Sequence, residues 1–225
     1  MTSTLAFDVY GTLIDTSGVF DTLQDMIGER ATPFMNRWRS KQLEYSFRRG
    51  LMDRHTDFSI CTKDALTYCC SSMGIDLTPK QKETLLDEYN MLPPFSDVKQ
   101  ALEDCLNAGH RTYAFSNGSK SAVELLLNHA GIKELFNGIV STEDVQMFKP
   151  SPVVYQHFIK TSGATRESAW LISGNTFDVI GAASFGMKTA WVRRSEDMTF
   201  DPWEYEPTAV IGNLTELRTA LAKHS

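Results

Sequence analysis

The sequence lacks several features that would assign it to a whole class of proteins. Its 225 residues include 28 Asp and Glu against 22 Lys and Arg, so it lacks the basic excess of a general nucleic-acid surface. No apolar run is long enough to span a bilayer, and residues 1–7 have neither the basic stretch nor the apolar core of a secretory signal. We therefore expect no nucleic-acid partner, no membrane partner and a cytoplasmic location.

Cysteine is scarce, and its spacing fits neither a metal site nor a disulfide framework. None of Cys61, Cys69, Cys70 and Cys105 forms a CxxC pair, and two of them are adjacent. Free, mostly buried thiols in a reducing cytosol are the better interpretation. With 42% hydrophobic and 22% charged residues, the composition is that of a globular protein with a sizeable core.

Hydrophobic periodicity divides the chain into two kinds of segment. A short apolar strand is predicted at 5–9, and apolar residues then recur at helical spacing over about 16–91. Further along, short apolar strands alternate with helices, which is typical of a parallel sheet covered on both faces. The pattern predicts an α/β fold with a doubly wound parallel sheet, whose core comprises 1–14 and 95–225, interrupted by an all-helical insertion at 15–94.

The alternating part is regular enough to assign individual elements. Strands are predicted at 111–115, 138–140, 169–172 and 188–192. Helices are predicted at 96–108, 120–130, 152–162 and 178–185. Glycines at the ends of several of these helices support the assignment, because glycine readily adopts the left-handed conformation that ends a helix.

Polar residues follow several of the predicted strands. They are Asp8, then Ser116 with Asn117, then Lys149, and finally Ser173 with Asn175. Ligands of open α/β sheets bind beyond the carboxyl ends of the strands. Because parallel strands place all these ends at one edge, we expect the polar residues to converge there in one site.

The order of these residues resembles the haloacid dehalogenase superfamily over nearly the whole chain. The matching motifs are Asp8-Val9-Tyr10-Gly11-Thr12, Ser116-Asn117-Gly118-Ser119, Lys149-Pro150, and Ser173-Gly174-Asn175 followed by Asp178. Phosphatases of that superfamily carry acids at the positions of Tyr10 and Asn175, to bind Mg²⁺ and to protonate the leaving group. A tyrosine is a poor ligand for a hard cation and a poor proton donor. A magnesium phosphatase is therefore disfavoured, and we expect neither a metal nor a cofactor.

The helical insertion resembles one branch of the superfamily, the L-2-haloacid dehalogenases. Residues 38–45, which include Arg39, are similar to the signature helix of that branch. The chain differs from it at Ser40, where the branch often has Gln, and at Phe177, where it often has Trp, and both positions bear on pocket size and halide preference. The resemblance implies a Rossmann-like core with a helical cap, a homodimer, and hydrolysis of short L-2-haloalkanoic acids to D-2-hydroxy acids plus halide.

The resemblance also implies a role for each catalytic residue. Asp8 would attack the carbon that bears the halogen, and water would then hydrolyse the resulting ester. Halide leaves without a proton, so no acid is needed at Tyr10. Lys149 would keep Asp8 ionised, Asp178 would activate the water, and Asn175 would position it.

Further residues would orient this set. Thr12 would fix the direction of the Asp8 carboxylate, while Ser173 and Tyr155 would orient Asp178 and the lysine. These roles need only hydroxyl groups within hydrogen-bonding distance of a carboxylate.

The substrate would be a small halogenated carboxylic acid. Its carboxylate would be held by Ser116 and by backbone N–H groups near Tyr10 and Asn117. Arg39 and Asn117 would receive the departing halide, and Phe177 would line the pocket.

Simpler interpretations remain open for the same residues. Asp8 could only end a strand, Ser116 and Asn117 could cap the helix that starts near Ser119, and Asp178 could be a first-turn charge favoured by the helix dipole. Other functions also remain open: defluorination or small-ring hydrolysis on the same scaffold, or ligand binding without catalysis.

Overall fold

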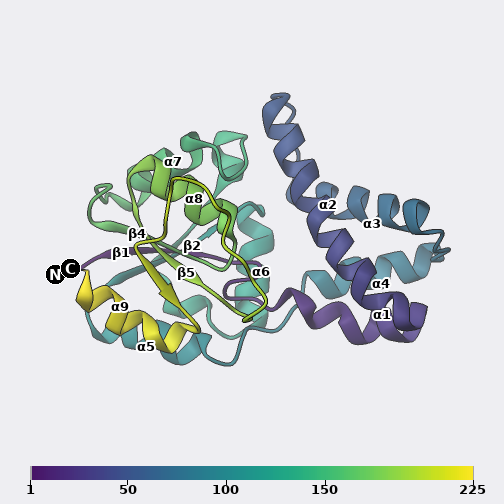
Figure 1. Cartoon of the computed structure of the whole chain (residues 1–225), viewed down its shortest axis with the longest axis horizontal. Coiled ribbons are helices and arrows are strands. Elements are labelled where there is room, and N and C mark those ends of the chain that lie inside the picture. Colours follow the sequence, from purple (N-terminus) through teal and green to yellow (C-terminus); the bar gives the residue numbers. More distant parts are fainter. Residues whose placement is uncertain (1, 225) are drawn as a thin grey trace.

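The computed structural model describes residues 2–224, in which an α/β core lies beside a group of helices (Figure 1). Met1 and Ser225, the outer ends of the predicted core segments, lie outside the described residues. The helical group is formed entirely by chain between the first and second strands of the core. The division into a core of 1–14 and 95–225 and a cap of 15–94 stays a prediction.

A parallel six-stranded sheet forms the core, in the order β3-β2-β1-β4-β5-β6. The strands are β1 (Thr4–Asp8), β2 (Arg111–Ser116), β3 (Gly138–Ser141), β4 (Ala169–Ser173), β5 (Lys188–Val192) and β6 (Ala209–Ile211). The chain winds outward from β1 to β3 and then crosses to the other side to form β4, which pairs with β1. This doubly wound order, which the sequence predicts, places Asp8 at the switch point where such sheets bind ligands.

Helices cover both faces of the sheet. They are α5 (Val98–Asn107), α6 (Lys120–His129), α7 (Pro152–Ser162), α8 (Thr176–Phe185) and α9 (Leu217–Lys223). In Figure 1, α7 and α8 lie on one face and α5 and α9 on the other. The helix predicted at 178–185 begins earlier, at Thr176, because Asn175 has the extended conformation of an N-cap residue. Asp178 therefore lies in the first turn of α8.

The helical group contains four α-helices. They are α1 (Phe20–Ile27), α2 (Ala31–Leu51), α3 (Phe58–Met73) and α4 (Pro79–Tyr89). The two chain segments that join this group to the core run side by side: the Asp15 N–H donates to the Pro93 carbonyl over 2.9 Å, and the Phe95 N–H donates to the Leu13 carbonyl over 3.0 Å. These short paired connections are the only covalent links between core and helical group within residues 2–224.

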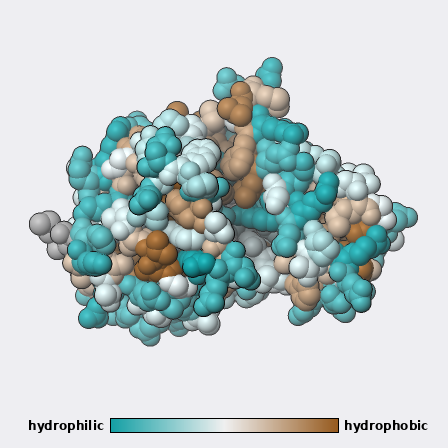
Figure 2. Space-filling view, in the orientation of Figure 1, coloured by the Kyte–Doolittle hydropathy of each residue, from teal (hydrophilic) through white to brown (hydrophobic). Residues whose placement is uncertain are grey.

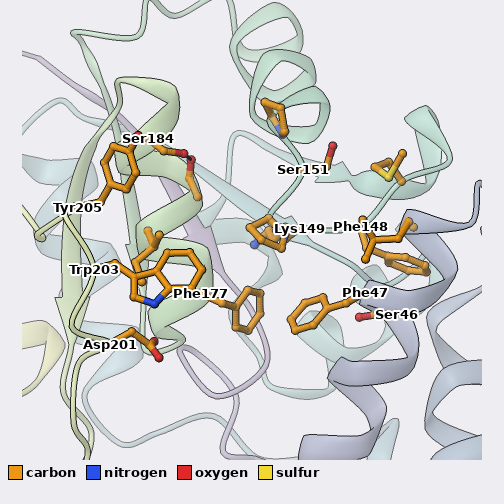
Figure 3. Close-up of a pocket in the computed structure, with 17 residues that line it drawn as sticks. Ser46, Phe47, Phe148, Lys149, Ser151, Phe177, Ser184, Asp201, Trp203 and Tyr205 are labelled. Carbon is orange, nitrogen blue, oxygen red and sulfur yellow. Dashed lines mark hydrogen bonds between the residues drawn. The ribbon is translucent and has the colours of Figure 1, made fainter.

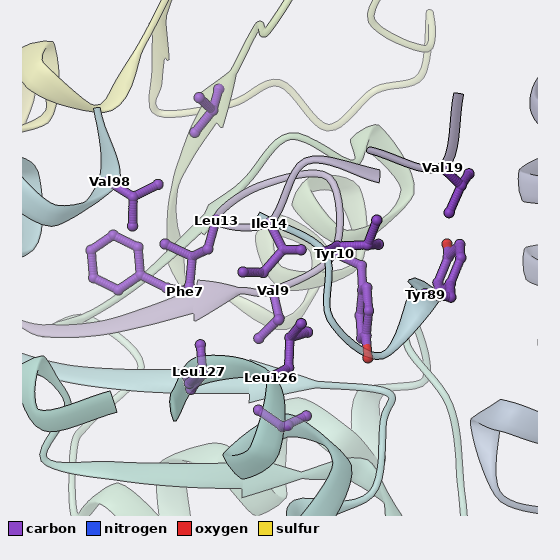
Figure 4. Packing of buried hydrophobic residues seen from close by; sticks show 14 of the residues in the cluster. Phe7, Val9, Tyr10, Leu13, Ile14, Val19, Tyr89, Val98, Leu126 and Leu127 are labelled. Carbon is purple, nitrogen blue, oxygen red and sulfur yellow. The ribbon is translucent and has the colours of Figure 1, made fainter. Parts of the chain in front are cut away.

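One hydrophobic cluster extends from the sheet into the helical group. Phe7, Val9 and Leu13 are fully buried around β1 and its following turn, where Figure 4 shows them packed together. Tyr10 stacks on Tyr89 of α4 with ring centroids 5.8 Å apart, which continues the cluster into the helices. Burial on every side fixes β1, and the carboxyl end of the strand is held with it.

Two sequence predictions concern features outside the sheet. All four cysteines are free and buried, as predicted. Among residues 2–224, no helix combines the length and the apolar character needed to cross a membrane.

Candidate active site

Asp8 ends β1 and accepts hydrogen bonds on both carboxylate oxygens. Its Oδ2 accepts from Asn175 Nδ2 at 2.6 Å, Thr12 Oγ1 at 2.8 Å and Ser173 Oγ at 3.1 Å, while Oδ1 accepts from Lys149 Nζ at 3.0 Å. Burial alone would raise the pKa of this carboxyl, but the lysine charge and the donors outweigh burial and hold the pKa below its usual value. Asp8 is therefore an ionised carboxylate in a largely water-free place.

The turn after β1 is locked to the loop after β4. Thr12, which donates to Asp8, accepts a hydrogen bond from the Gly174 N–H at 2.8 Å. A Cβ atom at position 174 would lie 2.5 Å from the Gly11 carbonyl oxygen, so only glycine permits this approach. Thr12 therefore lies where it can hold the carboxylate in one direction.

Lys149 is shared between two carboxylates. Its Nζ donates to Asp8 Oδ1 at 3.0 Å, to Asp178 Oδ2 at 2.8 Å and to the Phe115 carbonyl at 2.8 Å. Its side chain is only 1% exposed. Burial lowers the pKa of the ammonium, but Asp178 and Asp8 raise it by more than burial lowers it. The pKa therefore lies above its usual value, and the group stays charged.

Asp178 is completely buried behind Lys149. Its Oδ1 accepts from the Tyr155 hydroxyl at 2.8 Å, and its Oδ2 accepts from Lys149. Burial, reinforced by the nearby charge of Asp8, raises the pKa of Asp178 to about 6 against the opposing effect of the lysine. Tyr155 thus contacts the acid that it was predicted to orient.

The geometry corrects one predicted contact and adds a partner for a second residue. Ser173 was expected to orient Asp178 and Lys149, but its Oγ donates to Asp8, because β4 lies next to β1 and the last residues of both strands are neighbours. Asn175 was expected to position water, and this role stays a prediction; its Nδ2 donates to Asp8 and to the Tyr10 carbonyl at 2.9 Å. Both residues therefore hold the nucleophile in this structure.

Arg39 reaches the site from α2 of the helical group. Its Nη2 lies 3.4 Å from the Tyr10 carbonyl and 3.4 Å from Asn175 Oδ1, and its Nη1 donates to Gln42 Oε1 at 2.6 Å. The Tyr89 hydroxyl donates to the same Gln42 oxygen at 3.2 Å. Gln42 and Tyr89, which sequence reasoning missed, support the guanidinium. The only sequence feature that could have indicated this support is a polar residue, Gln42, at a position on the buried face of α2.

The residues predicted to bind substrate meet around one small cavity. Its lining comprises Asp8, Tyr10, Arg39, Leu43, Phe58, Ser116, Asn117, Lys149, Asn175 and Phe177. Leu43 and Phe58 come from the helical group, and Leu43 was not predicted. The cavity measures about 10 Å³, which is about the space of one water molecule, so substrate entry requires movement of the cap or of the lining rings.

Two strand-end residues in this cavity are already engaged with the backbone. Ser116 Oγ accepts from the Gly118 N–H at 3.1 Å, and Asn117 Oδ1 accepts from the Lys149 N–H at 2.9 Å. The N-cap residue of α6 is Ser119, so the simpler interpretation of Ser116 and Asn117 as helix caps is wrong.

The site does not fit a divalent cation. The ammonium of Lys149 lies between Asp8 and Asp178, and the other carboxylate oxygens already accept hydrogen bonds. Tyr10 occupies the place of a second acid, and burial raises the pKa of its hydroxyl, so it stays neutral. Within residues 2–224, no group of three or more His, Cys, Asp and Glu side chains could hold a metal ion.

Comparison with known proteins decides the family. A family model described as haloacid dehalogenase-like hydrolase matches residues 2–186. The chain belongs to the haloacid dehalogenase-like hydrolases. The (S)-2-haloacid dehalogenase of Pseudomonas sp. (strain YL) is 34% identical over 97% of both chains, and the haloacetate dehalogenase H-2 of Moraxella sp. (strain B) is 34% identical over 84% of this chain and 85% of its own.

Solved structures agree with this haloacid dehalogenase-like hydrolase along its whole length. The L-2-haloacid dehalogenase of Xanthobacter autotrophicus superposes with a TM-score of 0.92 at 28% identity, covering 100% of both chains. A second structure of that protein carries covalently bound chloropropionic acid and superposes equally well. The predicted family, the branch that it resembles and the fold class are confirmed.

The geometry defines what this haloacid dehalogenase-like hydrolase can do chemically. It has an ionised carboxylate that is held in one direction, an ammonium that stabilises it, and a second carboxylate with a raised pKa. Such a set can attack an electrophile and then accept a proton from water.

Proposed function

We propose that this chain hydrolyses short L-2-haloalkanoic acids to D-2-hydroxy acids plus halide, through an ester on Asp8. One observation carries the proposal: the nucleophilic carboxylate is kept ionised by Lys149, while Tyr10 stands where an acid would be needed to protonate an oxygen leaving group. Halide departs without a proton, so this site suits it. The 34% identity to named (S)-2-haloacid dehalogenases supports the same reaction.

In the first step, Asp8 Oδ1 attacks C2 of the substrate from the side opposite the halogen. Oδ1 has one donor whereas Oδ2 has three, so Oδ1 retains more free lone-pair density. The new C–O bond forms as the carbon–halogen bond breaks, and the electron pair leaves with the halide. Arg39 and Asn117 at the cavity wall stabilise the departing anion.

In the second step, water attacks the carbonyl carbon of the Asp8 ester. Asp178 accepts the proton from this water, and the proton then passes to the departing hydroxy-acid oxygen. The bond between that oxygen and the Asp8 carbonyl carbon breaks, so one water oxygen remains in the Asp8 carboxyl group. The other water proton is released to solvent as this group ionises again, so each turnover yields one halide and one proton. Asp178 lies 2.8 Å from the lysine that contacts Asp8, and its raised pKa suits a base that works near neutral pH.

Chloride release from each enantiomer of 2-chloropropionate tests the proposal. We expect the L enantiomer to yield chloride and D-lactate without added metal, and the D enantiomer to be inert. The absence of chloride from both enantiomers would reject the proposal. Hydrolysis of a generic phosphate ester that a chelator abolishes would indicate a magnesium phosphatase instead.

The raised pKa of Asp178 leads us to expect that turnover falls at acid pH. The pKa of Asp178 is about 6 in the free protein, and loss of the Asp8 charge in the ester lowers it. Because kcat reports the ester state, we expect it to be flat near neutral pH and to fall only below about pH 6 as Asp178 takes up a proton, by about tenfold per pH unit at the limit. Because the folded pKa exceeds the unfolded value, the contribution of this group to stability is fully present below about pH 4 and is lost as pH rises through about 6. Acid unfolding from this group therefore cannot imitate the loss, and kcat profiles beside thermal unfolding curves will separate the two effects.

Substitution of Arg39 should have a large effect on activity, and Arg37 on the same helix provides a matched control. We expect Arg39→Lys to lower kcat/KM for L-2-chloropropionate by about a hundredfold, because a single ammonium cannot reproduce the guanidinium fork at the halide position. Arg37→Lys, on α2 but outside the cavity, should stay within twofold. Equal activities of the two variants would remove Arg39 from the mechanism.

We also propose a cytoplasmic homodimer. The free, buried cysteines fit a reducing compartment. The homodimer rests on the resemblance to the L-2-haloacid dehalogenase branch, and sedimentation of the purified protein at several concentrations would test it.

A further inference from the structure

A groove of about 810 Å³ lies between the C-terminal end of α2 and the core. Its lining is mostly apolar and includes Phe47, Leu51, Met147, Ile180, Trp203 and Tyr205. Figure 2 shows apolar surface descending from the end of α2 into the hollow between the core and the helical group. The volume lies within the range of small-molecule sites in proteins.

The groove begins where the catalytic cavity ends. Lys149 and Phe177 line both spaces. Phe177, from the core, packs edge to face against Phe47, from α2, with ring centroids 5.1 Å apart. Figure 3 shows the two rings beside one another, with Lys149 above them in this view. Phe177, packed on Phe47, therefore lies where a cavity of about 10 Å³ meets a groove of about 810 Å³.

The charges around the groove specify what it can hold. Its charged lining residues are Lys149, already shared between Asp8 and Asp178, and Asp201 near Trp203. No free cation is available in this lining for a second anionic group, and Asp201 would repel one. Trp203 is 62% exposed and Leu51 is 88% exposed, so an apolar ligand would remove both from water.

We propose that this groove binds the hydrocarbon chain of 2-halo acids larger than propionate. The carboxylate and the carbon–halogen bond lie in the catalytic cavity, and the chain passes between Phe47 and Phe177 onto Trp203 and Leu51. This inference rests on the proposed function and extends its substrate class to medium-chain acids.

A substrate series at fixed halogen tests the inference in the wild-type protein. Burial of each methylene contributes up to about fourfold, so kcat/KM should be at least about tenfold higher for L-2-bromooctanoate than for L-2-bromopropionate. Unreactive octanoate should inhibit turnover of bromopropionate at least about tenfold more strongly than propionate does. The inhibition measurement reports binding without requiring reaction of the long substrate.

Two variants change the groove without touching the catalytic cavity. Ser184 is exposed on α8 and lines the groove, so Ser184→Phe should block it and lower kcat/KM for bromooctanoate by about tenfold, while bromopropionate stays within twofold. Trp203→Ala should lower the value for bromooctanoate by about fivefold, again without affecting bromopropionate. Ser71→Phe, an exposed helix position outside the groove, is the matched control and should change neither substrate.

The outcomes separate this inference from the proposed function. Halide from neither bromo acid would reject the function itself. Halide from bromopropionate together with slower turnover of bromooctanoate, or equal loss of both substrates in Ser184→Phe, would overturn only the groove assignment. A changed sedimentation coefficient in Ser184→Phe or Trp203→Ala would also overturn it, because the groove would then be a contact between copies of the chain.

Discussion

Asp8→Asn should reduce halide release from L-2-chloropropionate by at least about a thousandfold, because the amide carries no charge and cannot form the ester. The variant should stay folded, since Lys149 keeps Asp178 as a partner and the amide has the shape of the carboxylate. Steady-state halide release beside a thermal unfolding curve gives both quantities. Asp25→Asn, an exposed acid on α1, should behave like the wild type.

Isotope labelling tests directly whether an ester forms on Asp8. A single turnover of the wild type in heavy-oxygen water should place one heavy oxygen in Asp8, because the water attacks the ester carbonyl. Heavy oxygen found only in the product hydroxyl would mean that water attacks the substrate carbon directly. Residual activity of Asp8→Asn within tenfold of the wild type would contradict the covalent mechanism as well.

Lys149→Met should lower the free energy of unfolding by about 3–5 kcal/mol at pH 8, because two buried carboxylates lose their shared cation. Halide release should fall at least about a hundredfold, since Asp8 loses the charge that keeps it ionised. Denaturant unfolding monitored by fluorescence measures the first effect.

Measurements at two pH values and a second substitution show whether Lys149→Met is destabilised by the loss of charge or by the loss of packing. Without the lysine, the pKa of Asp178 rises further, so proton uptake at pH 5 should relieve part of the destabilisation seen at pH 8. The double variant Lys149→Met with Asp178→Asn should recover stability at pH 8 relative to Lys149→Met. A loss that is equal at both pH values and unaffected by the second substitution would indicate lost packing alone.

Most of the fold could be predicted because each core strand is a short apolar run between polar or glycine residues. The exception is β6, which has three residues at the edge of the sheet, one of them 55% exposed. Such a strand has too little length and burial to leave a periodic signal. The start of α8 at Thr176 was missed because Asn175, taken as a site residue, is also its N-cap.

The composition of the site could be predicted because parallel strands bring their carboxyl ends to one edge. Individual contacts within the site were harder to predict. The sequence pattern does not say which carboxylate the hydroxyl of Ser173 meets, and the pairing of β4 with β1 selects Asp8. The support of Arg39 by Gln42 and Tyr89 depends on how α2 packs on α4, which no local pattern specifies. The predicted Arg39 position itself came from the resemblance.

The sharing of Lys149 by two acids has a consequence for the order of the two steps. Asp8, Asp178 and the lysine between them together carry two negative charges and one positive charge. Alkylation of Asp8 removes one negative charge, and with it the repulsion that helps to raise the pKa of Asp178. Asp178 thus becomes more firmly ionised at the stage where the proposed mechanism has it accept a proton from water. The acid limit of the hydrolysis step should therefore lie below the value of about 6 found for the free protein.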